Sequence, residues 1–447
     1  MRILDWKQLG AAERRQALAR PAQEARADIT AFAAEVIAAV RRDGEAAVKF
    51  YTKKLDGITV DDLAVGKPEF AAARDTLTRE QVAAIECAID NVQRFHAAQM
   101  PQPMQMETMP GVNCERVIRP IPSVGLYVPA GSAPLPSAVV MLAVPARIAK
   151  CPQRVLCTPP NREGRANAAV LVAAELCGIE TVFKVGGAQA IAAMAYGTVT
   201  IPKVDKIFGP GNAWVTAAKQ LAAADPAGAA FDLPAGPSEV MVIADGSARP
   251  EFVAADLLAQ AEHDTQAQAI LVTPSRQLAE RTVQAVEAQL GLLSRQSILA
   301  KSLQTCRCIV VGDLREAVSV ANEYAAEHLI VQVEEPRRWI PDIHNAGSIF
   351  LGAWSPESMG DYCSGTNHVL PTYGYARAYS GLSVQDFIKR ITVQELTPAG
   401  LKLLGPVAVT LAGLEGLDAH ANAVTRRLNA MGEETVARGT AAPGGAR

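Results

Sequence analysis

From Gly125 onward, short apolar runs alternate with alanine-rich stretches, and this alternation limits the possible folds more than any other feature. The runs GLYVP, RVLCTP, TVFKV and KIFGP are each followed by a helical pattern, at residues 137–149, 166–177, 188–196 and 212–223. A second series with the same alternation extends from EVMVIAD, which starts at Glu239, to SIFLG, which starts at Ser348. Strands separated by helices are typical of parallel sheets covered by helices. The sequence therefore predicts two α/β lobes.

The regions before and after these series are predicted to be mostly helical. Residues 29–55 and 78–99 have apolar positions at three- and four-residue spacing, and Thr78 begins a TREQ capping box. The helical character is expected to continue to about Pro120. Residues 356–383 are rich in glycine, proline and serine and predict an extended loop, whereas 384–431 predict a helical tail.

Charge and hydropathy exclude several classes of protein. The formal net charge of −3 over 447 residues argues against a protein that coats nucleic acid. The longest apolar run, at 138–144, ends at Pro145 and is too short to span a bilayer. The first residues lack the pattern of a signal peptide, and the eight cysteines form no C-x-x-C pair. We therefore expect a cytoplasmic protein with reduced thiols that binds neither nucleic acid nor membranes.

Two short motifs combine histidine with other polar groups. In DLLAQAEHD, Gln260 and His263 share one face near the end of a helix, where they can bind zinc or simply face solvent. In AAEHL, Glu327 and His328 lie where a helix gives way to a strand. Because such junctions usually lie away from the ligand-binding edge of a parallel sheet, the motif alone favours a structural role.

Three further segments have polar groups suited to binding. Asp361 and His368 lie in the glycine-rich loop, where Asp361 is a hard oxygen donor and His368 can bind a ligand or hold the loop. Glu415 and His420 are five residues apart in the tail, and Gly416 can break the helix between them. The turn in DLPAGPSEV holds Ser238 at a strand entrance.

Glycine-rich turns occur in VGGAQA and FGPGNAW, each between a strand and a helix. Backbone N–H groups at such helix starts can meet an anion, although most such turns are only tight connections. No G-x-G-x-x-G follows a strand and no P-loop is present, so the glycine spacing alone does not predict a dinucleotide site.

Taken together and in this order, the segments resemble the L-histidinol dehydrogenase family. The resemblance covers about residues 36–431 and is carried by YVPAGSAPLPS, VGGAQAIAA, KVDKIFGPGNAWV, DLPAGPSEV, AQAEHD, AEHLI, AGSIFLG, SPESMGDYCSGTNHVLPTYGYAR and EGLDAHANAV. One departure is visible, because the family commonly has two glycines after the proline of YVP, where this chain has Ala130 and Gly131.

The resemblance implies the last step of histidine biosynthesis, a four-electron oxidation of L-histidinol to L-histidine through L-histidinal with NAD and one zinc ion per subunit. By matching motif positions, Glu327 and His328 would be the acid–base pair. Zinc would be held by Gln260, His263, Asp361 and His420. Substrate contacts would come from Ser238, Gln260, His263, His328, Asp361, Glu415 and His420, and NAD contacts from Tyr127, Gln189 and Asn212.

The implied architecture is a pair of incomplete Rossmann-like lobes of the aldehyde dehydrogenase type with helical N- and C-terminal extensions. The expected division is an extension at 1–24, one lobe from 25–124 and 237–380, an NAD-binding lobe at 125–236, and a dimerisation tail at 381–447. The resemblance also implies a domain-swapped homodimer, in which Glu415 and His420 come from the partner subunit.

Two alternatives remain open from the sequence. The same scaffold can act on another polar alcohol such as a sulfonated diol, although Glu415 suits a cationic substrate better than an anionic one. A binding protein that keeps the fold without zinc or turnover is the other alternative.

Overall fold

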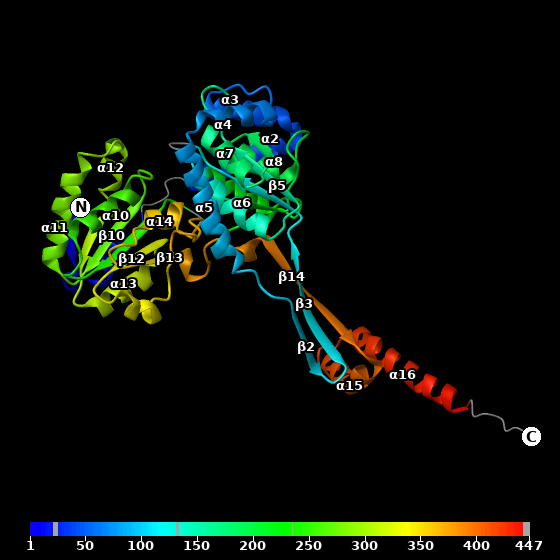
Figure 1. Ribbon diagram of the computed structural model, residues 1–447. Coiled ribbons are helices and arrows are strands. Elements are labelled where there is room, and N and C mark those ends of the chain that lie inside the picture. Colours follow the sequence, from blue (N-terminus) through cyan, green and yellow to red (C-terminus); the bar gives the residue numbers. More distant parts are fainter. Residues whose placement is uncertain (21–25, 131–133, 235, 441–447) are drawn as a thin grey trace, which may run out of the picture. The chain divides into compact units, whose positions relative to one another are not determined.

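The computed structural model describes residues 1–20, 26–130, 134–234 and 236–440 (Figure 1). The chain divides into two compact units. The first comprises Met1–Met100 and Pro120–Phe387, and the second comprises Pro101–Arg119 and Ile388–Arg447. Gly131, part of the turn in which the sequence departs from the family, lies outside the described residues.

The first unit contains a five-stranded parallel sheet that corresponds to the first βα series. In space, the strands run in the order β6-β5-β4-β7-β8. The strands are β4 (Ser123–Tyr127), β5 (Gln153–Thr158), β6 (Thr181–Lys184), β7 (Lys206–Phe208) and β8 (Ala230–Phe231). They alternate with the helices α6 (Pro136–Ile148), α7 (Ala168–Leu176), α8 (Gly187–Tyr196) and α9 (Ala213–Ala224).

A six-stranded parallel sheet in the same unit corresponds to the second series, in the order β1-β11-β10-β9-β12-β13. Its strands are β9 (Glu239–Ala244), β10 (Gln268–Thr273), β11 (Arg307–Val310), β12 (His328–Gln332), β13 (Ser348–Leu351) and, at the edge, β1 (Arg2–Asp5). Without β1, both sheets have their strands in the order third, second, first, fourth and fifth. This is the order of the first five strands of a Rossmann fold, so the expected pair of incomplete Rossmann-like lobes is confirmed.

Both faces of the six-stranded sheet are covered by helices. Every residue of β9 and β10 is buried, as parallel strands between two helix layers require. Met241 and Ile243 pack into a core with α13, whereas Val240 and Val242 pack into a core with α10 on the other face. The helices of this lobe are α10 (Pro250–Ala261), α11 (Arg276–Leu290), α12 (Gln296–Ser302) and α13 (Leu314–Tyr324).

The N-terminal helices contact the lobe of the five-stranded sheet, which differs from the expected assignment of residues 25–124 to the lobe of 237–380. Helix α2 packs on α8 and α9, α3 on α8, α4 on α7, and α5 on α6. The reason is apolar matching, because Val36 and Val40 of α2 join the core that contains Ile191 and Val215. These helices are α2 (Arg26–Asp43), α3 (Glu45–Asp56), α4 (Lys67–Thr76) and α5 (Arg79–Ala97), and α5 begins with the predicted capping box at Thr78.

The second unit combines two chain segments far apart in sequence. Its three-stranded sheet has the order β14-β3-β2, with β2 (Met104–Met109), β3 (Val112–Pro120) and β14 (Ile388–Leu396), and it is followed by α15 (Pro398–Leu414) and α16 (Asp418–Thr440). The predicted helical structure near Pro120 and at the start of the tail is therefore wrong. At Gly111, which has a φ of +77°, a Cβ would lie 2.2 Å from Thr397 Oγ1, so the close approach of the two segments requires glycine.

The fold bears on two further predictions from the sequence, which concern the state of the cysteine thiols and membrane-spanning helices. All eight cysteines are free thiols. Among the described residues, no helix combines the length and the apolar character needed to cross a membrane.

Candidate active site

Glu327 and His328 form a buried pair at the amino end of β12. Helix α13 ends at Tyr324, the chain turns at Ala325 with a φ of +56°, and β12 begins at His328. The side chains of both residues are buried beside the start of β9, where His328 is in register with Val240. The helix-to-strand junction predicted from the sequence is therefore present, and it is part of a densely polar region.

The surroundings of His328 assign its two ring nitrogens. Nδ1 lies 3.2 Å from the carbonyl oxygen of Glu239 and 3.1 Å from Oε1 of Gln260. Because both neighbours are acceptors, Nδ1 carries the hydrogen and donates it. Nε2 then holds the lone pair in the neutral ring, and it lies 3.4 Å from Oδ1 of Asp361. The atom able to accept a proton is thus Nε2.

Glu327 is held by a backbone group across the sheet. Its Oε2 accepts a hydrogen bond of 2.8 Å from the N–H of Glu239 and lies 3.6 Å from Nδ1 of His328. Burial raises the pKa of Glu327 to about 8. Burial also opposes a charge on His328, yet the carboxylates of Glu327 and Asp361 outweigh it and raise the pKa of His328 to about 10. Proton exchange near neutral pH is therefore accessible to Glu327, whereas His328 keeps its proton there until the neighbouring negative charge is offset.

Gln260 and Asp361, two of the expected zinc ligands, flank the His328 ring. Gln260 is buried near the end of α10, and its Nε2 has no hydrogen-bond partner among the described residues. Asp361 lies on the helix α14 (Glu357–Tyr362), so the predicted extended loop begins with a helical turn. His263 follows α10 and is exposed, and its N–H donates to the Gln260 carbonyl at 3.2 Å.

Within the described residues, no three His, Cys, Asp or Glu side chains form a group that could hold a metal. Two properties of the expected ligand set account for this, since one ligand is a glutamine and another, His420, belongs to the second unit. The donors in the first unit nevertheless fit zinc in kind, with an imidazole, a carboxylate and an amide oxygen. The first unit thus supplies an incomplete but suitable ligand set.

The remaining expected substrate residues lie in two places. Ser238 is half-buried immediately before β9, and its carbonyl accepts from the N–H of Gln268. Glu415 and His420 are exposed in the second unit, on either side of Gly416, whose φ of +69° separates α15 from α16. The predicted helix break at Gly416 is therefore confirmed. His368 holds the loop, because its Nδ1 lies 2.7 Å from the Asp361 carbonyl oxygen.

The three residues expected to contact NAD lie at the carboxyl ends of the five-stranded sheet. Tyr127 ends β4, and its hydroxyl accepts from the N–H of Gly187 at 3.1 Å. Gln189 is fully buried, and neither atom of its amide has a partner among the described residues. Asn212 caps α9 by accepting from the N–H of Val215. The unsatisfied Gln189 amide suits a ligand that supplies hydrogen-bonding groups.

Two buried carboxylates of the same lobe, Glu357 and Asp256, were not predicted from the sequence. Both carboxylate oxygens of Glu357 lack a hydrogen-bond partner among the described residues, and burial raises its pKa well above the usual range. Asp256 accepts from Gln332 Nε2 at 2.5 Å, and burial raises its pKa to about 7. The sequence did contain one signal for them. Asp256 lies one helical turn before Gln260, and Glu357 lies one helical turn before Asp361, so each unpredicted carboxylate is on the same helix face as an expected ligand.

Comparison with known proteins adds an independent finding. A family model described as histidinol dehydrogenase matches residues 18–428. The chain is 54% identical over 431 residues to a histidinol dehydrogenase of Vibrio cholerae, which covers 96% of this chain and 99% of that protein. It is 52% identical over 428 residues to one of Xanthomonas campestris, with the same coverage. A crystal structure of histidinol dehydrogenase from Elizabethkingia anophelis superimposes with a TM-score of 0.91 at 46% identity, covering 95% of this chain and 97% of that one.

Proposed function

The chain belongs to the histidinol dehydrogenase family, and we propose that it oxidises L-histidinol to L-histidine through L-histidinal. The single observation that best supports this activity is the geometry of His328, whose Nδ1 is held by two acceptors while Nε2 remains available. We propose NAD as the hydride acceptor in both oxidations. Two hydrides leave the same carbon, and one water is added at the aldehyde stage.

His328 serves as the base in the first oxidation. Its Nε2 takes the proton of the substrate hydroxyl as the hydride leaves the adjacent carbon. The acceptors at Nδ1 stabilise the imidazolium that forms, because a charged donor strengthens both hydrogen bonds. A cation bound at Asp361 would offset the negative charge that now raises the pKa of His328, so that the neutral base forms near neutral pH.

Glu327 serves in the second oxidation. The aldehyde must gain water before a second hydride can leave, and the Glu327 carboxylate removes a proton from that water. The Glu239 N–H that holds Oε2 fixes the direction of the carboxylate. His328 then accepts the hydroxyl proton of the hydrate as the carboxylic acid forms. A pKa of about 8 for Glu327 allows proton exchange at each turnover.

We propose that zinc is held by Gln260, His263 and Asp361 of one subunit and His420 of its partner. When bound, zinc orients the amino and imidazole groups of the substrate and polarises the reacting oxygen. Glu415 would lie beside His420 and pair with the cationic part of the substrate. Oε1 of Gln260, which accepts from His328 Nδ1, keeps a second lone pair that would be available to the metal.

A homodimer is supported by an apolar stripe on α15. Leu403, Val407, Leu411 and Leu414 are each more than half exposed, and their spacing puts them on one helix face. Such a face is covered by another protein surface. Mixing His263→Ala and His420→Ala subunits should restore about a quarter of the wild-type activity, since half of the dimers are mixed and each has one intact site. No recovery in proven heterodimers would contradict the exchange of ligands.

The function is tested by NADH formation with L-histidinol, before and after chelation. We expect two NADH per histidinol, loss of activity on zinc removal and recovery on zinc addition. A sulfonated diol serves as the control alcohol. No turnover of histidinol by the zinc-loaded protein would contradict the proposal.

A further inference from the structure

Glu239 contacts both members of the acid–base pair through its backbone. Its N–H donates to Oε2 of Glu327 at 2.8 Å, and its carbonyl oxygen accepts from Nδ1 of His328 at 3.2 Å. The two peptide groups flanking one residue therefore fix the carboxylate and the imidazole together. Anything that fixes Glu239 also fixes the pair.

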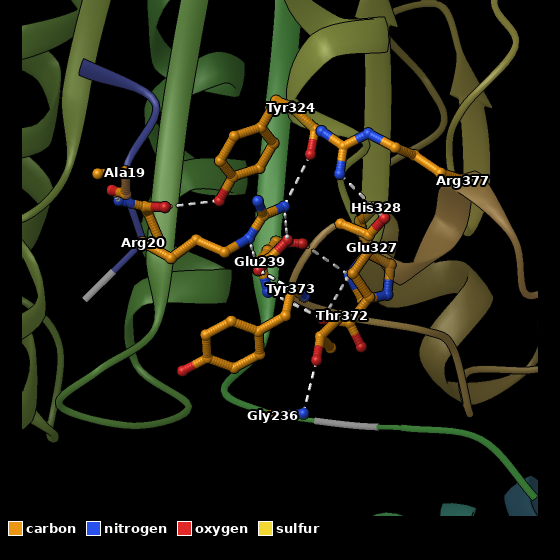
Figure 2. Close-up of polar contacts among 12 residues, drawn as sticks. Ala19, Arg20, Gly236, Glu239, Tyr324, Glu327, His328, Thr372, Tyr373 and Arg377 are labelled. Carbon is orange, nitrogen blue, oxygen red and sulfur yellow. Dashed lines mark hydrogen bonds and ion pairs between the residues drawn. The ribbon is translucent and has the colours of Figure 1, made fainter. Parts of the chain in front are cut away.

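The Glu239 side chain is 3% exposed, and a buried carboxylate is stable only with well-placed partners. Arg20 supplies two of them, with Nε 2.5 Å from Oε1 and Nη2 2.9 Å from Oε2. The N–H of Tyr373, in the loop after Asp361, donates to Oε1 at 2.9 Å. Figure 2 shows the Arg20 guanidinium beside Glu239, with Glu327 and His328 on the far side of the carboxylate.

Arg20 is itself held in place by a closed ring of contacts. Its Nη2 donates to the carbonyl of Tyr324 at 2.8 Å, and its guanidinium lies 4.0 Å from the centre of the Tyr324 ring. The Tyr324 hydroxyl donates to Oε1 of Gln268 at 2.6 Å. Nε2 of Gln268 in turn donates to the carbonyl oxygen of Ala19, the residue before Arg20, at 3.1 Å. Tyr324 also precedes the turn that leads into Glu327, so Arg20 contacts both Glu239 and the segment immediately before the pair.

The segment that supplies Arg20 is an integral part of the lobe. Strand β1 pairs in parallel with β11, and Trp6, Ala17 and Leu18 are buried in the core of the six-stranded sheet. Arg307 of β11 donates to the carbonyls of Gln16 and Ala17, which anchors the chain just before Arg20. The N-terminal segment thus delivers Arg20 from a fixed position, 219 residues away in sequence from its partner.

We propose that Arg20 is a positioning residue for the acid–base pair, acting through Glu239. The inference rests on the proposed roles of Glu327 and His328. Arg20 touches neither of them, so its removal should act on the chemical steps more than on substrate binding. Without the guanidinium, the buried Glu239 carboxylate must turn or gain a proton, and the backbone groups that hold Glu327 and His328 must shift with it.

The test compares Arg20→Met with Arg307→Met in the zinc-loaded enzyme. Arg307 anchors the same segment but has no contact with Glu239, so it reports loss of segment stability alone. For Arg20→Met we expect kcat to fall about tenfold or more in both oxidations, with KM for histidinol changed by less than about threefold. For Arg307→Met, the melting temperature should fall while kcat stays within about twofold of wild type.

A spectroscopic measurement separates this inference from the proposed function. In protein labelled with ¹⁵N-histidine, the His328 ring signals, assigned with His328→Asn, should move in Arg20→Met and not in Arg307→Met at one pH. This readout needs no substrate, so it tests Arg20 even if histidinol is not turned over. Unmoved ring signals together with an unchanged kcat in Arg20→Met would overturn the proposal.

Two further variants keep the test decisive if Arg20→Met does not fold. Arg20→Lys retains the charge but loses the two-point contact, so kcat should fall at a nearly normal melting temperature. Arg20→Met combined with Glu239→Gln removes the unpaired buried charge and should regain stability without regaining kcat. Wild-type kcat in Arg20→Lys, or stability and kcat recovering together in the double variant, would show that Arg20 is only structural.

Discussion

The two sheets of the first unit share one strand order but carry their polar groups at opposite ends. In the five-stranded sheet, Tyr127 ends β4, and Gln189 and Asn212 follow strands β6 and β7. In the six-stranded sheet, Ser238 and His328 lie where β9 and β12 begin. The strand order reverses between β4 and β7 in one sheet and between β9 and β12 in the other, where α/β sheets usually bind ligands, whereas β6 is an edge strand. Topology therefore selects the strands, but not which end of them is used.

The two ends offer different chemistry. At the carboxyl ends, strands lead into helices through glycine turns, which expose N–H groups suited to phosphates. Gly209 shows how tight these turns are, because a Cβ would lie 2.1 Å from the Tyr127 carbonyl oxygen. At the amino ends of β9 and β12, the N–H and carbonyl of Glu239 fix two ionisable side chains. We infer that the first arrangement suits binding of NAD and the second suits proton transfer.

The largest effect is expected at the amino ends. His328→Asn should lower kcat for both histidinol and histidinal by about a hundred- to ten-thousand-fold, because it removes the base. Glu327→Gln should slow mainly the histidinal step, since only that step needs an activated water. Both are measured by NADH formation from each substrate at saturating NAD. Equal losses in the two steps for Glu327→Gln would contradict the division of roles.

An intermediate effect is expected at the carboxyl ends of the other sheet. Gly187 has a φ of +63°, and a Cβ would lie 2.7 Å from Oε1 of Gln189. Gly187→Ala should therefore raise KM for NAD about tenfold, given a cost of about 1–2 kcal/mol, and leave kcat at saturating NAD nearly unchanged. Gly178→Ala is the matched control, because its φ is +74° but nothing lies within 4 Å. A fall in kcat with unchanged KM for NAD would contradict the assignment of NAD binding to these carboxyl ends.

The smallest effect on activity is expected at Asp256, which lies beside Gln332 at the carboxyl end of β12. Burial raises its pKa from 3.8 to about 7, so the folded state favours the neutral acid. This contribution to stability is complete below about pH 4 and is lost as the pH rises to about 7. Asp256→Asn should remove the dependence and stabilise the protein at pH 8 by up to a few kcal/mol. Thermal unfolding from pH 4 to 8 measures this, and parallel curves for variant and wild type would contradict it.

The sequence predicts the parts of the molecule whose signals are local. Alternating runs predicted the strands β4–β7 and β9–β13, and TREQ predicted the start of α5, because these depend on neighbours along the chain. The junction at Glu327 and His328 was found in the same way. The family resemblance then assigned these motifs to one expected site. The local patterns alone did not make that assignment.

The parts that were not predicted depend on partners far apart in sequence. Strands β2 and β3 were expected to be helical, but β2 pairs with β3, and β3 pairs in turn with β14, which lies more than 260 residues later. The packing of α2–α5 on the five-stranded lobe follows from complementary apolar faces that no local pattern reveals. Arg20 has no distinctive motif and Glu239, although part of DLPAGPSEV, was assigned no role, so only the fold shows that their buried ion pair lies behind the candidate base.

The most direct test of the central claim is hydrogen–deuterium exchange with NAD and with histidinol added separately to the zinc-loaded protein. NAD should slow exchange in peptides covering 185–190 and 209–213, at the carboxyl ends of the five-stranded sheet. Histidinol should slow exchange at 237–240 and 326–328, at the amino ends of β9 and β12. Protection by NAD at 237–240 and 326–328 without protection at 185–190 and 209–213, or by histidinol at 185–190 and 209–213 without protection at 237–240 and 326–328, would contradict the division of roles between the two sheets.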